Sequence, residues 1–342
     1  MRIDEARELW TPAGVYCNTA SYGLPPRPAW DALQAALADW QGGRTSWEHW
    51  GDTTDAARAG FARIVGVDTA RVAVGSTVSE LVGSLVTALP AGTRVVVPDI
   101  EFTSNLFPYL VQSRLEVRTV PVGEVAGAVA EGAGAAAFSA VQMSTGEVAD
   151  VDAIVAAAAS VGAVTICDAT QAVGWLPIDA GRFDALVCGA YKWLMSPRGT
   201  AFVTVSERLL HDAVPPSAGW YAGEDVHTSY FGPPLRLAAS ARRLDVSPAW
   251  FCWVGTAPAL ELIEEIGVGA IHEHDLALAN RFRAGLDLEA SDSAIVSVDI
   301  PDAAARLERA GIVAAIRGGR LRTSWHVYNT EHDVDRVLEA LA

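Results

Sequence analysis

The sequence predicts an α/β protein with a large domain, whose mostly parallel β-sheet carries helices on both faces, and a small α+β domain. Two observations predict this fold. Between residues 71 and 205, short β-rich runs alternate with helical stretches, and these β-rich runs are apolar almost throughout. Such runs are typical of parallel strands that are buried on both faces of a sheet. After about residue 255 the pattern changes to long amphipathic helix followed by short mixed segments.

Seven strands are expected in the large domain. The first two are each followed by a helical pattern, which continues to residue 89 in one case and covers residues 104–113 in the other. Residues 206–250 contain many Gly, Pro and aromatic residues, and we expect them to form long loops. The expected strands are 71–75, 93–98, 115–122, 135–141, 163–168, 184–189 and 200–205.

The small domain is expected to combine both ends of the chain. The helix after residue 255 is expected to break at Gly267–Gly269. Strand-like runs at 294–300, 311–317 and 320–326 surround a helix near residues 302–310, and a last helix starts at Glu331. We expect residues 21–259 to form the large domain, and residues 1–20 together with 260–342 to form the small one.

The composition indicates a folded, acidic protein. Of the 342 residues, 51% are hydrophobic and 19% are charged, and the formal net charge is −16. No basic patch is available to release counterions, so neither nucleic acid nor an anionic membrane is an expected partner. The four cysteines show no paired spacing and are expected to be reduced. The start has no apolar leader and the longest uncharged run has 15 residues, so we expect a cytoplasmic protein without a membrane span.

Asp168 and Lys192 carry the strongest chemical signal. Asp168 ends one apolar run, and Lys192 lies just beyond the next, between Tyr191 and Trp193, in a chain where lysine is rare. Ligands of parallel sheets bind beyond the carboxyl ends of the strands, so these side chains are expected to meet. A lysine that forms a Schiff base and an aspartate that holds a pyridinium nitrogen are what pyridoxal phosphate chemistry requires. Taken alone, Asp168 is also typical of a helix N-cap, and a single lysine is more often a surface residue than a catalytic one.

Ser76 and Thr77 follow the first strand and open a helix. Small hydroxyl residues and free backbone N–H groups at a helix N-terminus form a natural phosphate site. Alone they are also ordinary caps. Together with Asp168 and Lys192 they predict a phosphate-containing cofactor at this edge of the sheet.

The order of these motifs resembles that of fold-type I pyridoxal-phosphate enzymes of the class V aminotransferase group, which includes cysteine desulfurases, kynureninases and isopenicillin-N-epimerase-like proteins. The likeness extends over nearly the whole chain. It implies pyridoxal 5'-phosphate as the cofactor, no metal, and a homodimer with active sites at the interface. The matching segments are CNTASYGLPP (17–26), GSTVSE (75–80), DIEFTSNLFPYL (99–110), VQMSTGEVADVDAI (141–154), residues 167–200, WVGTAPAL (253–260) and LRTSWHVYNTEHDVDRVLEAL (321–341).

The resemblance also implies roles for individual residues. For the cofactor phosphate it implies contacts from Ser76, Thr77 and Tyr191, and contacts across the dimer from Gly255 and Thr256. For the cofactor ring it implies stacking by Phe102, a contact of Asp168 with the ring nitrogen and a contact of Gln171 with the phenolic oxygen. It further implies a Schiff base at Lys192 and pocket positions for Gln142 and Thr145. For substrate binding it implies Asn18, Ala20 and a carboxylate clamp at Arg322. Gly189 replaces a serine that is common in the group, which removes one expected phosphate contact.

The absence of a cysteine from one segment bears on which reaction the protein catalyses. Desulfurases of the group carry a nucleophilic cysteine shortly before the carboxylate-binding arginine, and residues 307–322 contain none. We therefore expect no persulfide chemistry. An aminotransferase acting on a small-molecule amino acid is the favoured interpretation. The alternatives are a C–S or C–C lyase or an epimerase, all with Lys192 as general base, and, from another class, a cofactor-free binding protein.

Overall fold

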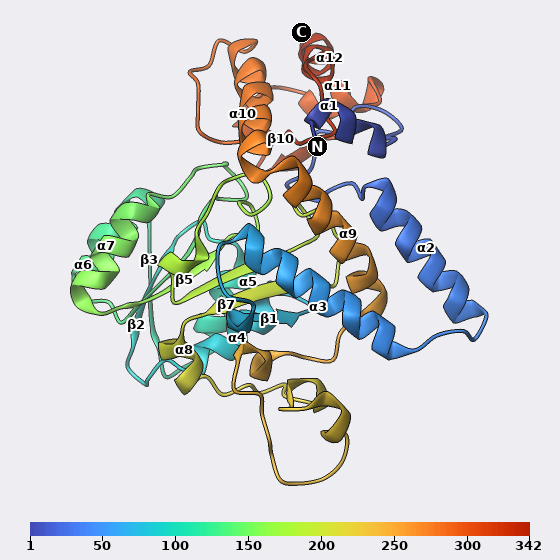
Figure 1. Cartoon of the computed structure of the whole chain (residues 1–342). Helices are drawn as coiled ribbons and strands as arrows, with labels where there is room; N and C mark the ends of the chain where they lie inside the picture. Colours follow the sequence, from blue (N-terminus) through green and yellow to red (C-terminus); the bar gives the residue numbers. More distant parts are fainter.

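A seven-stranded sheet forms the centre of the protein in a computed structural model, which describes residues 1–342 (Figure 1). All seven predicted strands are present. Their order across the sheet is β1–β7–β6–β5–β4–β2–β3. The bounds are β1 (Val72–Gly75), β2 (Arg94–Pro98), β3 (Glu116–Val120), β4 (Ala135–Ser139), β5 (Val164–Asp168), β6 (Ala185–Gly189) and β7 (Ala201–Val205).

Strand β7 is the one strand of this sheet that runs against its neighbours. It pairs antiparallel with both β1 and β6, whereas β6, β5, β4, β2 and β3 are parallel to one another. Only residues 190–200 connect β6 to β7, and a parallel crossover requires a dozen or more residues. The mostly parallel sheet predicted from the sequence is confirmed, and β1 consequently points the same way as β6.

Helices cover both faces of the sheet. Successive strand residues point to opposite faces, so Val74 belongs to one apolar core and Ala73 to the other. The first core is closed by α3 (Trp47–Ile64), α6 (Val125–Ala130), α7 (Val151–Val161) and α9 (Trp250–Ile266). The second core is closed by α4 (Val78–Val86), α5 (Thr103–Leu110) and α8 (Glu207–Asp212). Helix α2 (Arg27–Gln41) packs beside α9 (Figure 1).

A second, three-stranded antiparallel sheet forms the small domain, in the order β8–β10–β9. Val15 and Cys17 share its core with Phe282 and Trp325, and both chain termini lie there (Figure 1). The N-terminal segment therefore joins the C-terminal part, although the boundaries at residues 20 and 259 stay predictions. The elements are α1 (Ile3–Ala6), α10 (Val268–Ala284), β8 (Ile295–Val298), α11 (Ala303–Arg309), β9 (Ala315–Arg317), β10 (Arg320–Ser324) and α12 (Glu331–Leu341).

Local signals explain where several helices begin and end. The side chain of Thr77 accepts a hydrogen bond from the backbone of Glu80 and caps α4. Gly267 adopts a φ of 89° between α9 and α10, at the break predicted from the sequence. The long loops expected over residues 206–250 are present at 213–249, which contain only short 3₁₀ turns, but residues 207–212 form the helix α8 instead, capped by the side chain of Ser206.

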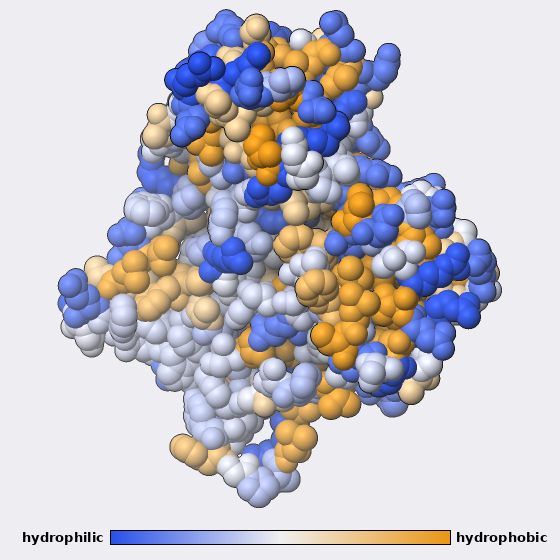
Figure 2. Space-filling model, turned by 180° about the vertical axis from the view of Figure 1, so that it is seen from behind, coloured by the Kyte–Doolittle hydropathy of each residue, from blue (hydrophilic) through white to orange (hydrophobic).

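The surface is mixed in character. Apolar areas lie among hydrophilic ones on the face seen in Figure 2. None of the helices is both long enough and apolar enough to span a bilayer.

Candidate active site

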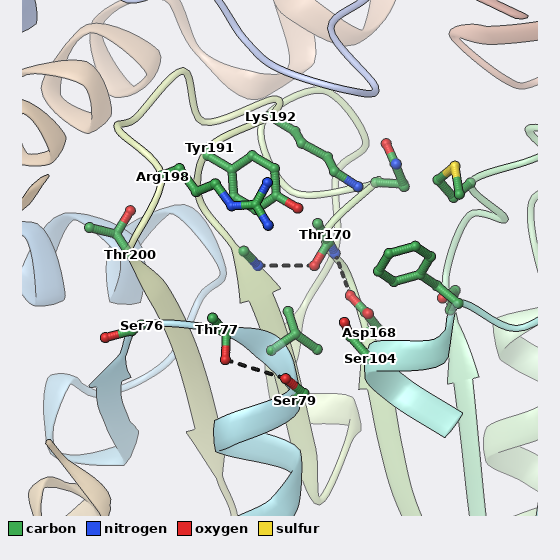
Figure 3. Close-up of a pocket in the computed structure, with 16 residues that line it drawn as sticks. Ser76, Thr77, Ser79, Ser104, Asp168, Thr170, Tyr191, Lys192, Arg198 and Thr200 are labelled. Atoms are coloured by element: carbon green, nitrogen blue, oxygen red, sulfur yellow. Dashed lines mark hydrogen bonds between the residues drawn. The ribbon is translucent and has the colours of Figure 1, made fainter. Parts of the chain in front are cut away.

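A pocket lies at the edge of the large sheet where β1, β4, β5 and β6 end and β7 begins (Figure 3). Because β7 reverses direction, the carboxyl ends of these four strands meet there. The pocket has a volume of about 800 Å³, including the part open to solvent, which suits a small-molecule ligand. Its lining residues are Ser76, Thr77, Val78, Ser79, Phe102, Ser104, Ser139, Met143, Asp168, Thr170, Gln171, Gly189, Tyr191, Lys192, Arg198 and Thr200.

Lys192 is the only lysine of the chain, and it projects into this pocket from the loop between β6 and β7. Its side chain is almost completely buried, and this burial lowers the pKa of the amine to about 8, although the nearby charge of Asp168 acts in the opposite direction. The Nζ atom lies 5.6 Å from the ring centroids of both Phe102 and Tyr191. Near neutral pH, more of this amine is therefore neutral, and nucleophilic, than in an ordinary lysine.

The backbone around Lys192 is fixed from both domains. The indole of Trp193 donates to Gln171 Oε1 at 2.8 Å, and the Trp193 carbonyl lies 3.0 Å from His326 Nε2. His326 is itself buried and contacts Asp275 Oδ2 through Nδ1 at 2.8 Å. Gly23 packs so closely that a Cβ atom there would lie 2.0 Å from the Lys192 carbonyl oxygen. Only glycine is compatible with this approach.

Asp168 ends β5 and is buried at the floor of the pocket. One carboxylate oxygen accepts a hydrogen bond from the Thr170 backbone at 2.9 Å, and the other accepts none from the chain. Burial raises the pKa of Asp168, while the bonds from Thr170 and the charge of Lys192 oppose that rise. One oxygen is therefore available to a hydrogen-bond donor on a ligand.

Glu101 is a second buried acid close to Asp168, and sequence reasoning missed it. Its carboxylate accepts from the backbone of Ser139 at 2.7 Å and from the backbone of Phe102 at 3.1 Å. Burial, together with the charge of Asp168, raises the pKa of Glu101 to about 7. The only signal in the sequence is its position directly before Phe102. Its hydrogen bonds tie the end of β4 to the start of α5 beside the pocket.

The N-terminus of α4 forms another wall. Ser76, Thr77 and Ser79 present hydroxyls there, and the Thr77 and Ser79 hydroxyls lie 3.4 Å apart (Figure 3). The backbone N–H groups of Thr77, Val78 and Ser79 donate to no acceptor in the chain, whereas that of Ser76 donates to Glu80. Free donors at the positive end of a helix dipole suit an anion.

Most cofactor residues proposed from the sequence meet in this pocket. The structure brings together Ser76, Thr77, Phe102, Asp168, Gln171, Tyr191 and Lys192. The Gln171 amide donates one of its two hydrogens to the Ala20 carbonyl at 3.0 Å, and the second hydrogen has no acceptor in the chain. Sequence reasoning missed the wall positions of Ser104, Ser139, Met143, Thr170, Arg198 and Thr200.

Four of the proposed cofactor residues lie away from the pocket wall. The Gln142 amide is turned toward Glu101 at 3.4 Å, and Thr145 is exposed. Gly255 packs against Pro197, and the buried Thr256 hydroxyl donates to a carbonyl of its own helix. A phosphate contact from Gly255 and Thr256 across a dimer stays a prediction.

The proposed substrate residues form a layer behind Met143. Arg322 is fully buried and donates to the Met143 carbonyl at 2.9 Å, Ser21 Oγ at 2.7 Å and Asn18 Oδ1 at 3.4 Å. It has no carboxylate partner, and its Nε atom has no hydrogen-bond partner at all. Burial and the charge of Arg317 lower the pKa of the Arg322 guanidinium to about 10. The structure therefore places Arg322, Asn18 and Ala20 next to the pocket but not on its wall.

The polar groups of the pocket fit pyridoxal 5'-phosphate. The free donors of α4 suit the phosphate, and the unoccupied oxygen of Asp168 suits a protonated ring nitrogen. Phe102 offers a ring face, and Lys192 an amine that can attach to the aldehyde. Figure 3 shows Asp168 on one side of the pocket and Ser76 with Thr77 on another, so the two polar ends are separated.

Comparisons with known proteins agree with this geometry. The aminotransferase class-V family matches residues 26–306. An uncharacterized aminotransferase of Bacillus subtilis is 26% identical over 87% of this chain and 85% of its own length. Isopenicillin N epimerase of Streptomyces clavuligerus is 27% identical over 98% of this chain and 96% of its own length. Among solved structures, a cysteine desulfurase of Thermococcus onnurineus superposes with a TM-score of 0.85 at 21% identity, over 99% of this chain and 97% of its own. The chain thus belongs to the class V aminotransferase family of pyridoxal 5'-phosphate-dependent enzymes.

Proposed function

We propose that this enzyme is an aminotransferase that acts on a small-molecule amino acid. The observation that carries the proposal is the position of Lys192: it is the only amine on the pocket wall, and burial lowers its pKa to about 8, which suits proton exchange with carbon near neutral pH. Aminotransfer moves one proton from the substrate α-carbon to the cofactor carbon bonded to the same amino nitrogen, and a single base can serve both carbons. The relative from Bacillus subtilis, named as an aminotransferase, supports the same choice.

Each group at the site has a separate task. Bound pyridoxal 5'-phosphate supplies an electron sink for negative charge on the substrate α-carbon. Asp168 would hold the protonated ring nitrogen through the carboxylate oxygen that accepts no hydrogen bond from the chain. Lys192 would hold the cofactor covalently, and its free Nζ would take the proton from the substrate α-carbon and deliver it to the cofactor carbon.

Arg322 is the proposed clamp for the substrate carboxylate. It is an arginine without an acidic partner, and a guanidinium fork matches a carboxylate in two parallel hydrogen bonds. Because Arg322 now donates to the Met143 carbonyl, and Met143 lines the pocket, Met143 must move for substrate to reach the guanidinium. Asn18 and Ser21 would hold the guanidinium in orientation from the N-terminal segment.

Persulfide chemistry is not supported. None of the four cysteines lines the pocket. Cys17, Cys167 and Cys188 are buried, and burial raises the pKa of each thiol, which disfavours the reactive thiolate. Cys252 lies half-buried beside the Arg198 carbonyl.

A C–S or C–C lyase is the second candidate, and Tyr191 favours it. The Tyr191 hydroxyl has no hydrogen-bond partner, and burial raises the pKa of the phenol, so it stays protonated and can supply a proton to a leaving group. Epimerisation, which the relative from Streptomyces clavuligerus catalyses by name, has less support. It calls for proton exchange on both faces of the substrate, and Phe102 offers no exchangeable proton.

The test is a panel of amino acids added singly to the holoenzyme. Aminotransfer predicts conversion of the bound cofactor to pyridoxamine 5'-phosphate together with release of the matching keto acid, both identified by chromatography. Release of ammonia, sulfide or another fragment, with the cofactor unchanged, would instead establish the lyase. The Lys192→Ala variant is the control and should give neither result.

We also propose a homodimer with the active sites at the interface. Helix α5, which begins directly after the pocket residue Phe102, exposes Phe107, Leu110 and Val111. Apolar side chains grouped beside a functional pocket are typical of an interface. Light scattering should give twice the chain mass, and Leu110→Asp should reduce it to a monomer.

A further inference from the structure

Arg198 is a cation of the pocket for which the chain provides no acid. It lies on the loop between β6 and β7, and apart from Lys192 it is the only basic side chain on the wall. Its Nη1 atom donates to the Tyr22 hydroxyl at 2.6 Å, while Nε and Nη2 donate to nothing in the chain. An arginine without a carboxylate partner, in a chain with a net charge of −16, leaves donors and charge available for an anionic ligand.

Two aromatic rings hold this guanidinium in place. The Arg198 Cζ atom lies 5.2 Å from the ring centroid of Tyr191 and 5.9 Å from that of Tyr22. The two rings are themselves 5.4 Å apart. Cation–π contacts at these distances restrict an otherwise flexible and exposed side chain.

Gly189 makes room for this arrangement. A Cβ atom at position 189 would lie 3.2 Å from Tyr191 Cε1, closer than ordinary contact, so any side chain there would push the ring away. The Gly189 N–H is already used, because it donates to Thr170 Oγ1 at 2.9 Å. Gly189 therefore offers a ligand neither a side chain nor a free donor.

Arg198 lies at the phosphate end of the pocket. Figure 3 shows Arg198 and Thr200 on one side, above Ser76 and Thr77, with Asp168 on the other side. Backbone donors and hydroxyls are the only other polar groups at that end. We propose that Arg198 binds the phosphate of the cofactor. The Tyr191 ring, for which Gly189 leaves room, positions the Arg198 guanidinium for this contact. This inference rests on the phosphate lying at the N-terminus of α4.

The experiment compares two ligands that differ only in the phosphate. Pyridoxal 5'-phosphate and pyridoxal are titrated separately into cofactor-free protein, and attachment to Lys192 is followed by visible absorption. Because Lys192 is the only lysine, the signal reports this site alone apart from the N-terminal amine. The variants are Arg198→Gln and, as control, Arg94→Gln, an exposed arginine on β2 that makes no hydrogen bond through its side chain.

We expect Arg198→Gln to weaken binding of pyridoxal 5'-phosphate by roughly 10- to 100-fold, the range for losing a charge-assisted hydrogen bond, with little change for pyridoxal. Arg94→Gln should match the wild type with both ligands. Equal weakening of both ligands would overturn the proposal, because Arg198 would then only shape the pocket. Unchanged affinities with a raised KM for dicarboxylic amino acids would assign Arg198 to the substrate and also overturn it. Failure of the wild type to bind either ligand would refute the cofactor site itself.

Discussion

The basicity of Lys192 is the property on which the proposed chemistry depends most directly. The structure lowers the pKa of this amine from its ordinary 10.5 to about 8, chiefly through burial. At pH 7 about one tenth of the amine would then be neutral, against about one part in 3000 for an ordinary lysine, a gain of roughly 300-fold. Asp168 opposes this effect, so Asp168→Asn should lower the pKa of Lys192 further, to below 8.

Competitive acetylation of the cofactor-free protein measures this pKa. The only amines are Lys192 and the N-terminus, so peptide mass spectrometry can follow both at every pH in one sample. The acetylation rate of Lys192 should rise with pH and level off near pH 8, and Asp168→Asn should move that break downward. The control, Asp212→Asn, changes an exposed acid on α8 and should leave the break in place. A break near pH 10.5, or an upward movement in Asp168→Asn, would refute the argument.

Three further predictions concern other residues. Arg322→Ala should raise KM for a carboxylate substrate by about tenfold or more while kcat changes less, and an unchanged KM would place the clamp elsewhere. Arg58→Met should lower the free energy of unfolding by about 3–5 kcal/mol in urea titrations, because it leaves a buried carboxylate unpaired, whereas the exposed Arg63→Ala should have little effect. The raised pKa of Glu101, about 7 against an ordinary 4.5, means that its contribution to stability is complete below pH 4.5 and is lost as the pH rises through 7. Glu101→Gln should therefore gain stability relative to the wild type between pH 5 and pH 8, and an equal difference at both pH values would contradict this.

The sequence was sufficient to predict the strands and seven of the sixteen residues that line the pocket. Strands such as Ala135–Ser139 are buried on both faces, so their apolar runs stand out against the Gly-rich and charged segments between them. Asp168, Lys192 and Ser76 could be placed together because they follow strands, and the carboxyl ends of parallel strands share one edge. Placing these residues together requires only that the strands run in the same direction.

Side-chain direction was harder to predict. Gln142 was expected on the pocket wall, but it turns to Glu101, whose burial could not be read from one charged letter in the chain. Arg198 is exposed and carries no pattern that separates it from a surface arginine until the Tyr22 and Tyr191 rings are seen around it. Such positions depend on contacts between residues that are distant in sequence.

The reversed strand β7 also has a consequence for the order of folding. Strand β1 has a single neighbour in the sheet, β7, and their pairing joins Val72 to Thr204. During synthesis, more than a hundred residues must follow β1 before its only partner strand leaves the ribosome. The pairing of β1 with β7 is therefore the slow, long-range step in forming the sheet. The N-terminus of α4 is attached to β1, so the proposed phosphate site is completed after the other strands can already pair. Cofactor present in the cell would accordingly stabilise only chains that have finished the sheet.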